Sequence, residues 1–304
     1  MMLRSAGYLV SGASGMLGSA LRQALAARNL PVLQLVRHEP ASPGQLQWNP
    51  AATPAIAATE PLEGLSAAIH LSGANVGAHR WTSAYKREMA ASRVDSTRAL
   101  AVALARLNKP PQALLVASAI GFYGNRGEEL LEESSAPGSG FLANVCQQWE
   151  AAAQPATEAG IRVVNLRFGV ILGPGPGALA RMTPIFRLGL GGRLGSGRQW
   201  MSWISLTDAV AAILFALDRP TLTGPVNLTA HSPVTNAEFT RVLARQLHRP
   251  AILPAPAFAL RLALGEMADE TLLASARVYP SKLTEAGFRF AHPTIRQALA
   301  AAFA

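Results

Sequence analysis

The feature that most constrains the fold is a glycine-rich turn near the start of the chain. It reads Gly12-Ala-Ser-Gly15-Met-Leu-Gly18, and it lies between a short apolar run and an amphipathic segment predicted to be a helix over 16–28. Glycines at these positions permit a tight turn, close approach of a ligand to the backbone, and close packing of the helix on the strand. Free amides at the start of the helix favour a bound pyrophosphate. The residues expected to contact this pyrophosphate are Gly12, Ser14, Gly15, Met16, Leu17 and Gly18.

Strand and helix signals alternate after this turn. Short, continuous apolar runs predict strands at 7–11, 31–37, 67–72, 113–119 and 162–166, and helical spacing predicts helices at 83–107 and 142–159. Continuous rather than alternating apolar runs are typical of a parallel sheet that is covered on both faces. The pattern therefore predicts an α/β chain with a doubly wound parallel sheet, the Rossmann type of fold.

The end of the second predicted strand indicates which dinucleotide is bound. It reads Leu35-Val36-Arg37, and its first carboxylate, Glu39, comes two residues later. A carboxylate at the strand end would bind the ribose 2′-OH of NAD, whereas a guanidinium pairs well with the 2′-phosphate of NADP. We therefore expect NADP(H), with Arg37 at the 2′-phosphate. The alternative is an exposed arginine at a strand end that binds nothing.

Glycine and proline crowd the chain after the last of these strands. Residues 173–177 and 189–197 are glycine-rich loops, and the segment after Pro250 is rich in alanine, leucine and proline at helical spacing. We expect residues 1–172 to form the NADP-binding Rossmann domain, with 205–230 returning to it. Residues 173–304 are expected to form a smaller substrate-side lobe that includes a small helical domain at about 250–300.

Composition excludes several other classes of protein. The net charge of +9 comes mostly from scattered arginines without a basic run, so no nucleic-acid partner is expected. No apolar stretch reaches the roughly 18 residues of a spanning helix. The six histidines lack zinc-ligand spacing and Cys146 is the only cysteine, so no metal site is expected. The start of the sequence lacks the hydrophobic region of a signal peptide, and a single thiol suits a reducing compartment. A cytoplasmic location is therefore expected.

Several further motifs resemble one protein family across nearly the whole chain. They are His70-Leu71-Ser72-Gly73-Ala74, Ser118-Ala-Ile-Gly-Phe-Tyr123-Gly124, Cys146-x-x-Trp149-Glu150, Arg167-Phe-Gly169-Val170, Trp203-Ile-Ser-Leu-Thr-Asp208 and Leu264-Gly-Glu266. With the G-x-x-G-x-x-G spacing, they resemble the extended short-chain dehydrogenases/reductases. The particular subgroup is the atypical NAD(P)-dependent epimerase-like family that carries a C-terminal domain of unknown function, some members of which are labelled cell-division inhibitors.

The resemblance implies further site residues. The fourth-strand motif places Leu71, Ser72 and Gly73 beside the adenine and ribose, and the helix that carries Glu88 and Arg93 flanks the dinucleotide. The motifs around Ser118 and Val170 lie toward the nicotinamide. For Glu88 and Arg93 the alternative is a solvated helix face, and for Ser118 it is an ordinary serine at a strand end.

The superfamily's usual catalytic pair is absent. Its members carry Tyr-x-x-x-Lys on the active-site helix, and none of the four tyrosines here has a lysine four residues later. If Glu150 marks the acidic residue that often follows the pair, Leu142 and Cys146 occupy the two positions, and neither side chain can replace the tyrosine or the lysine. The remaining catalytic candidates are Ser118 and Tyr123, although for Tyr123 the favoured alternative is a half-buried tyrosine that only packs.

Two functions therefore stay open. The first is an NADP(H)-dependent oxidoreductase or epimerase-like enzyme that acts on a small carbonyl or sugar-like substrate. The second, favoured by the missing pair, is a non-catalytic NADP(H) sensor that regulates another protein. The motifs of the C-terminal half favour the enzyme. A homodimer is left open.

Overall fold

A seven-stranded parallel sheet forms the centre of the structure, a computed structural model that describes residues 7–304. Its strands are β1 (Tyr8–Ser11), β2 (Val32–Val36), β3 (Gln45–Gln47), β4 (Ala67–His70), β5 (Ala113–Ala119), β7 (Arg162–Phe168) and β11 (Gly224–Leu228). They lie in the order β11-β7-β5-β4-β1-β2-β3, and every neighbouring pair is parallel. The chain winds outward in both directions from β1, as in a Rossmann fold, so the predicted fold class is confirmed.

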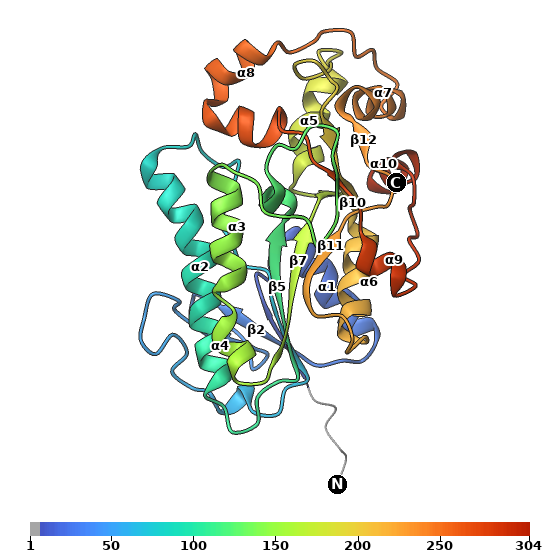
Figure 1. The fold of residues 1–304 in the computed structure, drawn as a ribbon. Coiled ribbons are helices and arrows are strands. Elements are labelled where there is room, and N and C mark those ends of the chain that lie inside the picture. The colour runs from blue at the N-terminus through green and yellow to red at the C-terminus, as the bar shows by residue number, and fades with distance from the viewer. Residues whose placement is uncertain (1–6) are drawn as a thin grey trace.

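Helices cover both faces of this sheet. On one face lie α2 (Ser83–Ala105), α3 (Phe141–Ala151) and α4 (Gln154–Glu158), and on the other lie α1 (Met16–Ala27) and α6 (Leu206–Leu217) (Figure 1). The central strands β4 and β5 are buried along almost their whole length, because apolar side chains point to helices on both sides. The long apolar runs of the sequence belong to these strands.

The structure differs from the expected elements in two places. The single helix predicted over 142–159 is divided into α3 and α4, because Pro155 cannot donate a backbone hydrogen bond and its ring would clash with the preceding turn. The short edge strand β3 was not predicted, since its three residues Gln-Leu-Gln carry no recognisable pattern.

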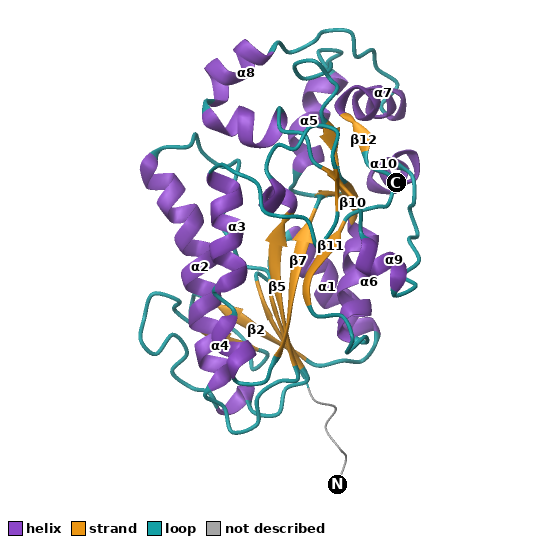
Figure 2. Ribbon diagram, viewed as in Figure 1, coloured by secondary structure: helices purple, strands orange, loops and turns teal. Residues whose placement is uncertain are grey.

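The remaining elements gather above the carboxyl ends of the strands (Figure 2). The helices there are α5 (Ala178–Arg187), α7 (Asn236–Gln246), α8 (Ala257–Leu264) and α10 (Ile295–Phe303), whereas α9 (Ser281–Glu285) lies beside β11. Three short strand pairs join them: β8 (Val170–Leu172) with β10 (Trp203–Ser205), β9 (Trp200–Met201) with β12 (Val234–Thr235), and β6 (Leu130–Leu131) with β13 (Arg277–Val278). Phe186, Trp203 and Phe239 belong to a separate apolar cluster of this region.

Part of the C-terminal half returns to the sheet. Strand β11 pairs with β7 at the edge, and α6 packs beside α1. The division into residues 1–172 and 173–304 stays a prediction, and residues 1–6 of the first part lie outside the described residues.

Candidate functional site

A cleft of about 820 Å³ lies at the carboxyl edge of the sheet, beside the point between β1 and β4 where the strand order reverses. Ligands of open α/β sheets bind at such a point. The structure brings nine of the predicted residues into the wall of this cleft: Gly12, Gly15, Met16, Leu17, Gly18, Leu71, Arg93, Ser118 and Val170. The other six do not line it: Ser14, Arg37, Ser72, Gly73, Glu88 and Tyr123.

The turn between β1 and α1 has the shape of a phosphate cradle. Gly12 has a positive φ of 67°, and a Cβ there would lie 2.7 Å from the carbonyl carbon and oxygen of Leu71. A Cβ on Gly18 would collide with the carbonyl oxygen of Gly12. Gly15 immediately precedes α1, so the first amides of the helix face the cleft without intrahelical partners. The three glycines therefore fit a diphosphate at the helix N-terminus.

A buried histidine holds the cradle from behind. The Nδ1 of His70 lies 2.6 Å from the Oγ of Ser11, and its Nε2 lies 3.0 Å from the Oγ of Ser96 on α2. The Ser11 hydroxyl also accepts a hydrogen bond from the amide of Leu71. This chain of contacts joins β1, β4 and α2 at the floor of the site. Burial lowers the pKa of His70 to about 4, so the ring is neutral at pH 7.

The neutral ring of His70 predicts acid sensitivity. Because its pKa is about 4 in the folded protein and 6.5 when unperturbed, the unfolded chain takes up its proton at higher pH. The contribution to stability is complete above pH 6.5 and is lost as the pH falls toward 4, by about 3 kcal/mol in total. Urea unfolding at several pH values should give a steeper decline for the wild type than for His70→Gln. Equal slopes would contradict this account. The comparison with His70→Gln is needed because burial raises the pKa of Glu133. The folded protein therefore takes up the Glu133 proton more readily than the unfolded chain, which raises stability as the pH falls and offsets part of the His70 effect.

Arg37 lies just beyond the end of β2, where the adenosine of a bound dinucleotide would reach. Its side chain is exposed, and in the part of the chain that the structure describes it forms no ion pair. Glu39 is also exposed. The guanidinium of Arg37 is therefore available to a ligand, although it does not line the cleft.

Arg93 provides a positive charge in the wall of the cleft. Its guanidinium donates to the carbonyl oxygens of Ala74, at 2.8 Å, and Met89, at 3.1 Å, and stacks over the ring of Trp149. No carboxylate pairs with it among residues 7–304, and burial lowers its pKa. A partly buried cation without a counter-ion favours an anionic or electron-rich ligand. Glu88, on the same helix, is exposed and does not line the cleft.

Ser118, at the end of β5, is held by a buried ion pair. Its hydroxyl donates to Oε1 of Glu150 at 2.7 Å, and the Nε and a terminal nitrogen of Arg167 each donate to the same carboxylate at 2.8 Å. The side chains of Arg167 and Glu150 are only 4% and 11% exposed. The hydroxyl proton of Ser118 is therefore engaged in the hydrogen bond to Glu150, and in the cleft its oxygen can still accept a hydrogen bond.

Tyr123 lies on the far side of Arg167, away from the cleft. Its hydroxyl donates to Oδ1 of Asn227 at 2.7 Å and accepts from Arg167 at 3.0 Å, and its side chain is fully buried. Burial also raises its pKa. This placement gives no support to the role of Tyr123 as a proton donor to substrate, because the hydroxyl has two protein partners and does not line the cleft.

Leu142 and Cys146 occupy the wall of the cleft on α3, one turn apart. Burial, followed by the nearby charge of Glu150, raises the pKa of Cys146 to about 12, so its thiol stays protonated. Neither residue can supply the proton or the charge of a tyrosine–lysine pair.

The sequence did not reveal how the C-terminal segment closes this cleft. The carboxylate of Glu270 accepts hydrogen bonds from the amides of Phe141 and Leu142 at the start of α3, each at 3.1 Å. Gly140 has a positive φ of 107°, which favours glycine, and a Cβ there would displace this carboxylate. The segment from Asp269 to Ala276 lines the cleft opposite the glycine turn. The only sequence signal nearby was the motif Leu264-Gly-Glu266.

The described part of the chain contains no helix that could cross a membrane. Among residues 7–304 there is also no group of three or more side chains that could hold a metal ion.

Comparison with known proteins shows the family of the chain. The NAD dependent epimerase/dehydratase family matches residues 8–228, and a domain of unknown function (DUF1731) matches residues 255–302. The chain therefore belongs to the NAD-dependent epimerase/dehydratase family and has its Rossmann-like, NAD(P)-binding fold.

Individual relatives match this chain over nearly its full length. The chain is 47% identical over 292 residues to Epimerase family protein Mb2239 of Mycobacterium bovis, covering 95% of both chains. The crystal structure of human epimerase family protein SDR39U1 with NADPH has a TM-score of 0.89 and 32% identity, covering 97% of this chain and 98% of that one. A nucleoside-diphosphate sugar epimerase of Corynebacterium glutamicum has a TM-score of 0.80 and 34% identity, covering 98% of this chain and 58% of that one. The predicted family is confirmed.

Proposed function

We propose that this protein is an NADP(H)-dependent oxidoreductase or epimerase-like enzyme that acts on a small carbonyl or sugar-like substrate. One observation carries the proposal: the cleft runs without interruption from the glycine cradle, past Ser118, to the C-terminal segment around Glu270. At about 820 Å³, it has the size of a site for a small molecule together with part of a cofactor. The bound nicotinamide would supply hydride transfer, and the chain would supply binding and orientation.

NADP(H) is proposed because of the charge at the adenosine end. Arg37, just after β2, forms no ion pair with any residue from 7 to 304, and no carboxylate occupies that strand end. Arg93 lines the cleft itself, near Cys146, so its charge favours an anionic dinucleotide in general and does not bear on the choice between NADP and NAD. The solved relative SDR39U1 was crystallised with NADPH, which supports the same choice.

Exchanging the charge at Arg37 tests this preference. In Arg37→Asp the carboxylate would repel the 2′-phosphate and accept a hydrogen bond from the 2′-OH, so NADPH affinity should fall by about tenfold or more while NADH affinity is kept or rises. Fluorescence titration of both dinucleotides measures the ratio. The matched control is Arg98→Asp, which changes an exposed arginine on α2 that does not line the cleft. An unchanged ratio in Arg37→Asp would show that this residue does not read the cofactor.

The missing tyrosine–lysine pair favours a second candidate, a protein that binds NADP(H) without catalysis and regulates a partner. Both carboxylates that line the cleft already have partners within the protein, so neither is free to act as a proton donor. Glu270 caps α3, and Asp269 pairs with Arg261. An enzyme would then take its proton from the substrate or from water. Ser118 would orient the substrate or the cofactor by accepting a hydrogen bond.

A substrate screen separates the two candidates. Oxidation of NADPH should be followed by absorbance with aldehydes, ketones, quinones and nucleotide sugars. Turnover that depends on Ser118, shown by its loss in Ser118→Val, supports the enzyme. Tight NADPH binding without turnover across the panel supports the sensor. A cytoplasmic location suits the single buried thiol, and a homodimer is still an open prediction.

A further inference from the structure

A second concave surface lies far along the chain from the cofactor residues, between α7 and the segment that follows it. This groove has a volume of about 730 Å³. Its floor is made of small side chains, among them Ala237, Thr240 and Ala244 of α7, and Ala251. Small residues at these positions leave room for a side chain from outside.

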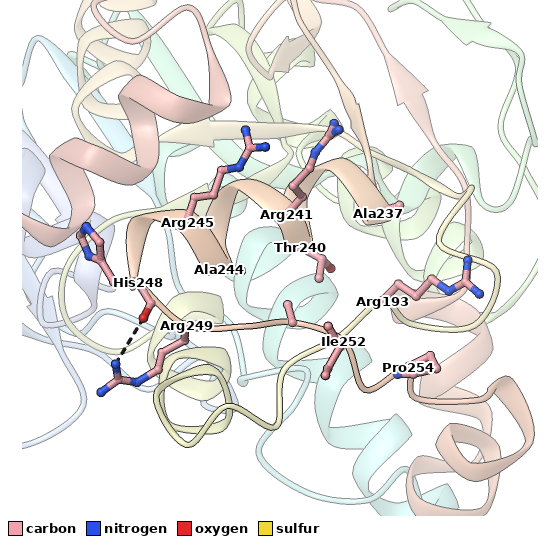
Figure 3. Close-up of a pocket in the computed structure, with 11 residues that line it drawn as sticks. Arg193, Ala237, Thr240, Arg241, Ala244, Arg245, His248, Arg249, Ile252 and Pro254 are labelled. Carbon is pink, nitrogen blue, oxygen red and sulfur yellow. Dashed lines mark hydrogen bonds between the residues drawn. The ribbon is translucent and has the colours of Figure 1, made fainter.

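Cations surround this floor. They are Arg193, Arg241, Arg245, His248 and Arg249, and all five are exposed. Figure 3 shows Arg241 and Arg245 projecting from the same side of α7, with Arg193 near one end of the helix and His248 and Arg249 at the other. We call these five residues and the floor between them the arginine groove. No acidic side chain lines it.

The guanidinium groups of this groove have few partners within the protein. Arg249 donates to the carbonyl oxygens of Arg187 and His248. Over the described residues 7–304, none of the four arginines forms an ion pair. Four arginines held close together without carboxylates repel one another, and an anionic partner would remove that repulsion.

Exposed aliphatic side chains lie beside the arginine groove. The segment around Arg249 and Leu253 runs next to the end of α5, since Arg249 donates to Arg187 and the amide of Leu253 donates to the carbonyl of Gly191. These two segments carry four exposed side chains, which we call the apolar rim: Leu188 (74% exposed), Leu190 (55%), Ile252 (78%) and Leu253 (50%). Large apolar side chains gathered in this way are typical of an interaction surface.

We propose that the arginine groove and the apolar rim together bind an acidic, amphipathic segment of a partner protein. The carboxylates of such a segment would pair with the guanidinium groups, and its apolar side chains would cover the rim. A concave groove fits a peptide better than a flat bilayer. The rim is aliphatic and offers no Phe, Tyr or Trp ring of the kind that forms the stacking platform of single-stranded nucleic-acid sites. A small free anion would leave the rim uncovered.

The test uses a fluorescent helical peptide in which glutamates line one face and leucines the other. Anisotropy titration should show saturable binding that weakens as salt is added. Reversing two charges in Arg241→Glu/Arg245→Glu should weaken binding by at least about tenfold, and Ile252→Ser/Leu253→Ser should have a similar effect. Circular dichroism melting checks that each variant folds.

The matched control reverses two exposed arginines elsewhere, Arg98 on α2 and Arg289 after α9. The variant Arg98→Glu/Arg289→Glu should bind within about twofold of wild type, because only general charge has changed. If Arg98→Glu/Arg289→Glu lost as much affinity as Arg241→Glu/Arg245→Glu, binding would depend only on the net charge of the protein, and the proposal would be overturned.

Other occupants give contrary results. Binding to anionic phospholipid vesicles but not to the peptide would assign the surface to a membrane. Full displacement of the peptide by tripolyphosphate, with no effect of the Ile252→Ser/Leu253→Ser change, would assign it to a free anion. Concentration-dependent self-association that Arg241→Glu/Arg245→Glu abolishes would assign it to a second copy of the chain. Each of these results, like a complete lack of peptide binding, would overturn the proposal.

Discussion

A Gly15→Val variant is expected to lose NADPH affinity by about 100-fold or more while it folds as the wild type does. Gly15 has φ −71° and ψ 168°, an extended conformation that valine adopts readily. Among the described residues not adjacent to it in the chain, only the Gly12 oxygen comes within 4 Å of an added Cβ, at 3.4 Å. The new side chain would not clash with the protein but would project at the helix N-terminus, into the space proposed for the pyrophosphate. The loss corresponds to about 2.7 kcal/mol or more of binding free energy.

Two further glycines make this result specific. Gly44→Val, before β3 and outside the cleft, is the matched control, since its nearest contact would be 3.7 Å away, and NADPH affinity should not change. Gly12→Val should instead destabilise the fold, because its positive φ and its contact with Leu71 exclude a side chain. Titration by NADPH fluorescence and thermal melting separate the two effects. Full NADPH affinity in Gly15→Val would place the diphosphate elsewhere.

Arg167→Met is expected to lower the free energy of unfolding by about 3–5 kcal/mol, the largest stability effect in this account. Arg167 is 3% exposed, makes two hydrogen bonds to Glu150, and lies 3.5 Å above the ring centre of Phe122. Removing it leaves the Glu150 carboxylate in the interior with only Ser118 as a hydrogen-bond donor. Leaving a buried charge without its partner costs more free energy of folding than the intact ion pair contributes to it.

The double variant Arg167→Met/Glu150→Leu tests this reason. If the cost comes from the stranded carboxylate, removing it as well should restore much of the lost stability, because apolar replacement of a buried pair is often close to neutral. Urea unfolding of the wild type, both single variants and the double variant forms the cycle. A double variant less stable than Arg167→Met would contradict the explanation.

The sequence predicted the sheet and the cradle because both depend on local patterns. Continuous apolar runs identify buried parallel strands, and the spacing of Gly12, Gly15 and Gly18 follows from a single strand–turn–helix unit. These residues are close in the chain, so their arrangement in space can be read from their order.

The opposite wall of the cleft could not be predicted in the same way. Glu270 reaches the start of α3 from more than a hundred residues away, and nothing in its local sequence indicates that contact. Ser118, Glu150 and Arg167 each appeared in separate motifs, but their assembly into one ion-paired network depends on the pairing of β5 with β7 and the packing of α3. The same network explains why Tyr123 turns away from the cleft.

The arginine groove illustrates a further limit. Scattered arginines in the sequence carried no basic run, and the net charge was interpreted as a bias of composition. In the fold, Arg193 lines the same groove as Arg241 and Arg245, although about fifty residues of chain separate them. Charge clustering in three dimensions need not leave a cluster in the sequence.

Calorimetric titration of the purified protein with NADPH is the most direct test of the central claim that the β1–α1 turn holds a dinucleotide phosphate. The account predicts saturable binding with one dinucleotide per chain, and a stronger response to NADPH than to NADH. The absence of measurable heat or fluorescence change with either dinucleotide would contradict it.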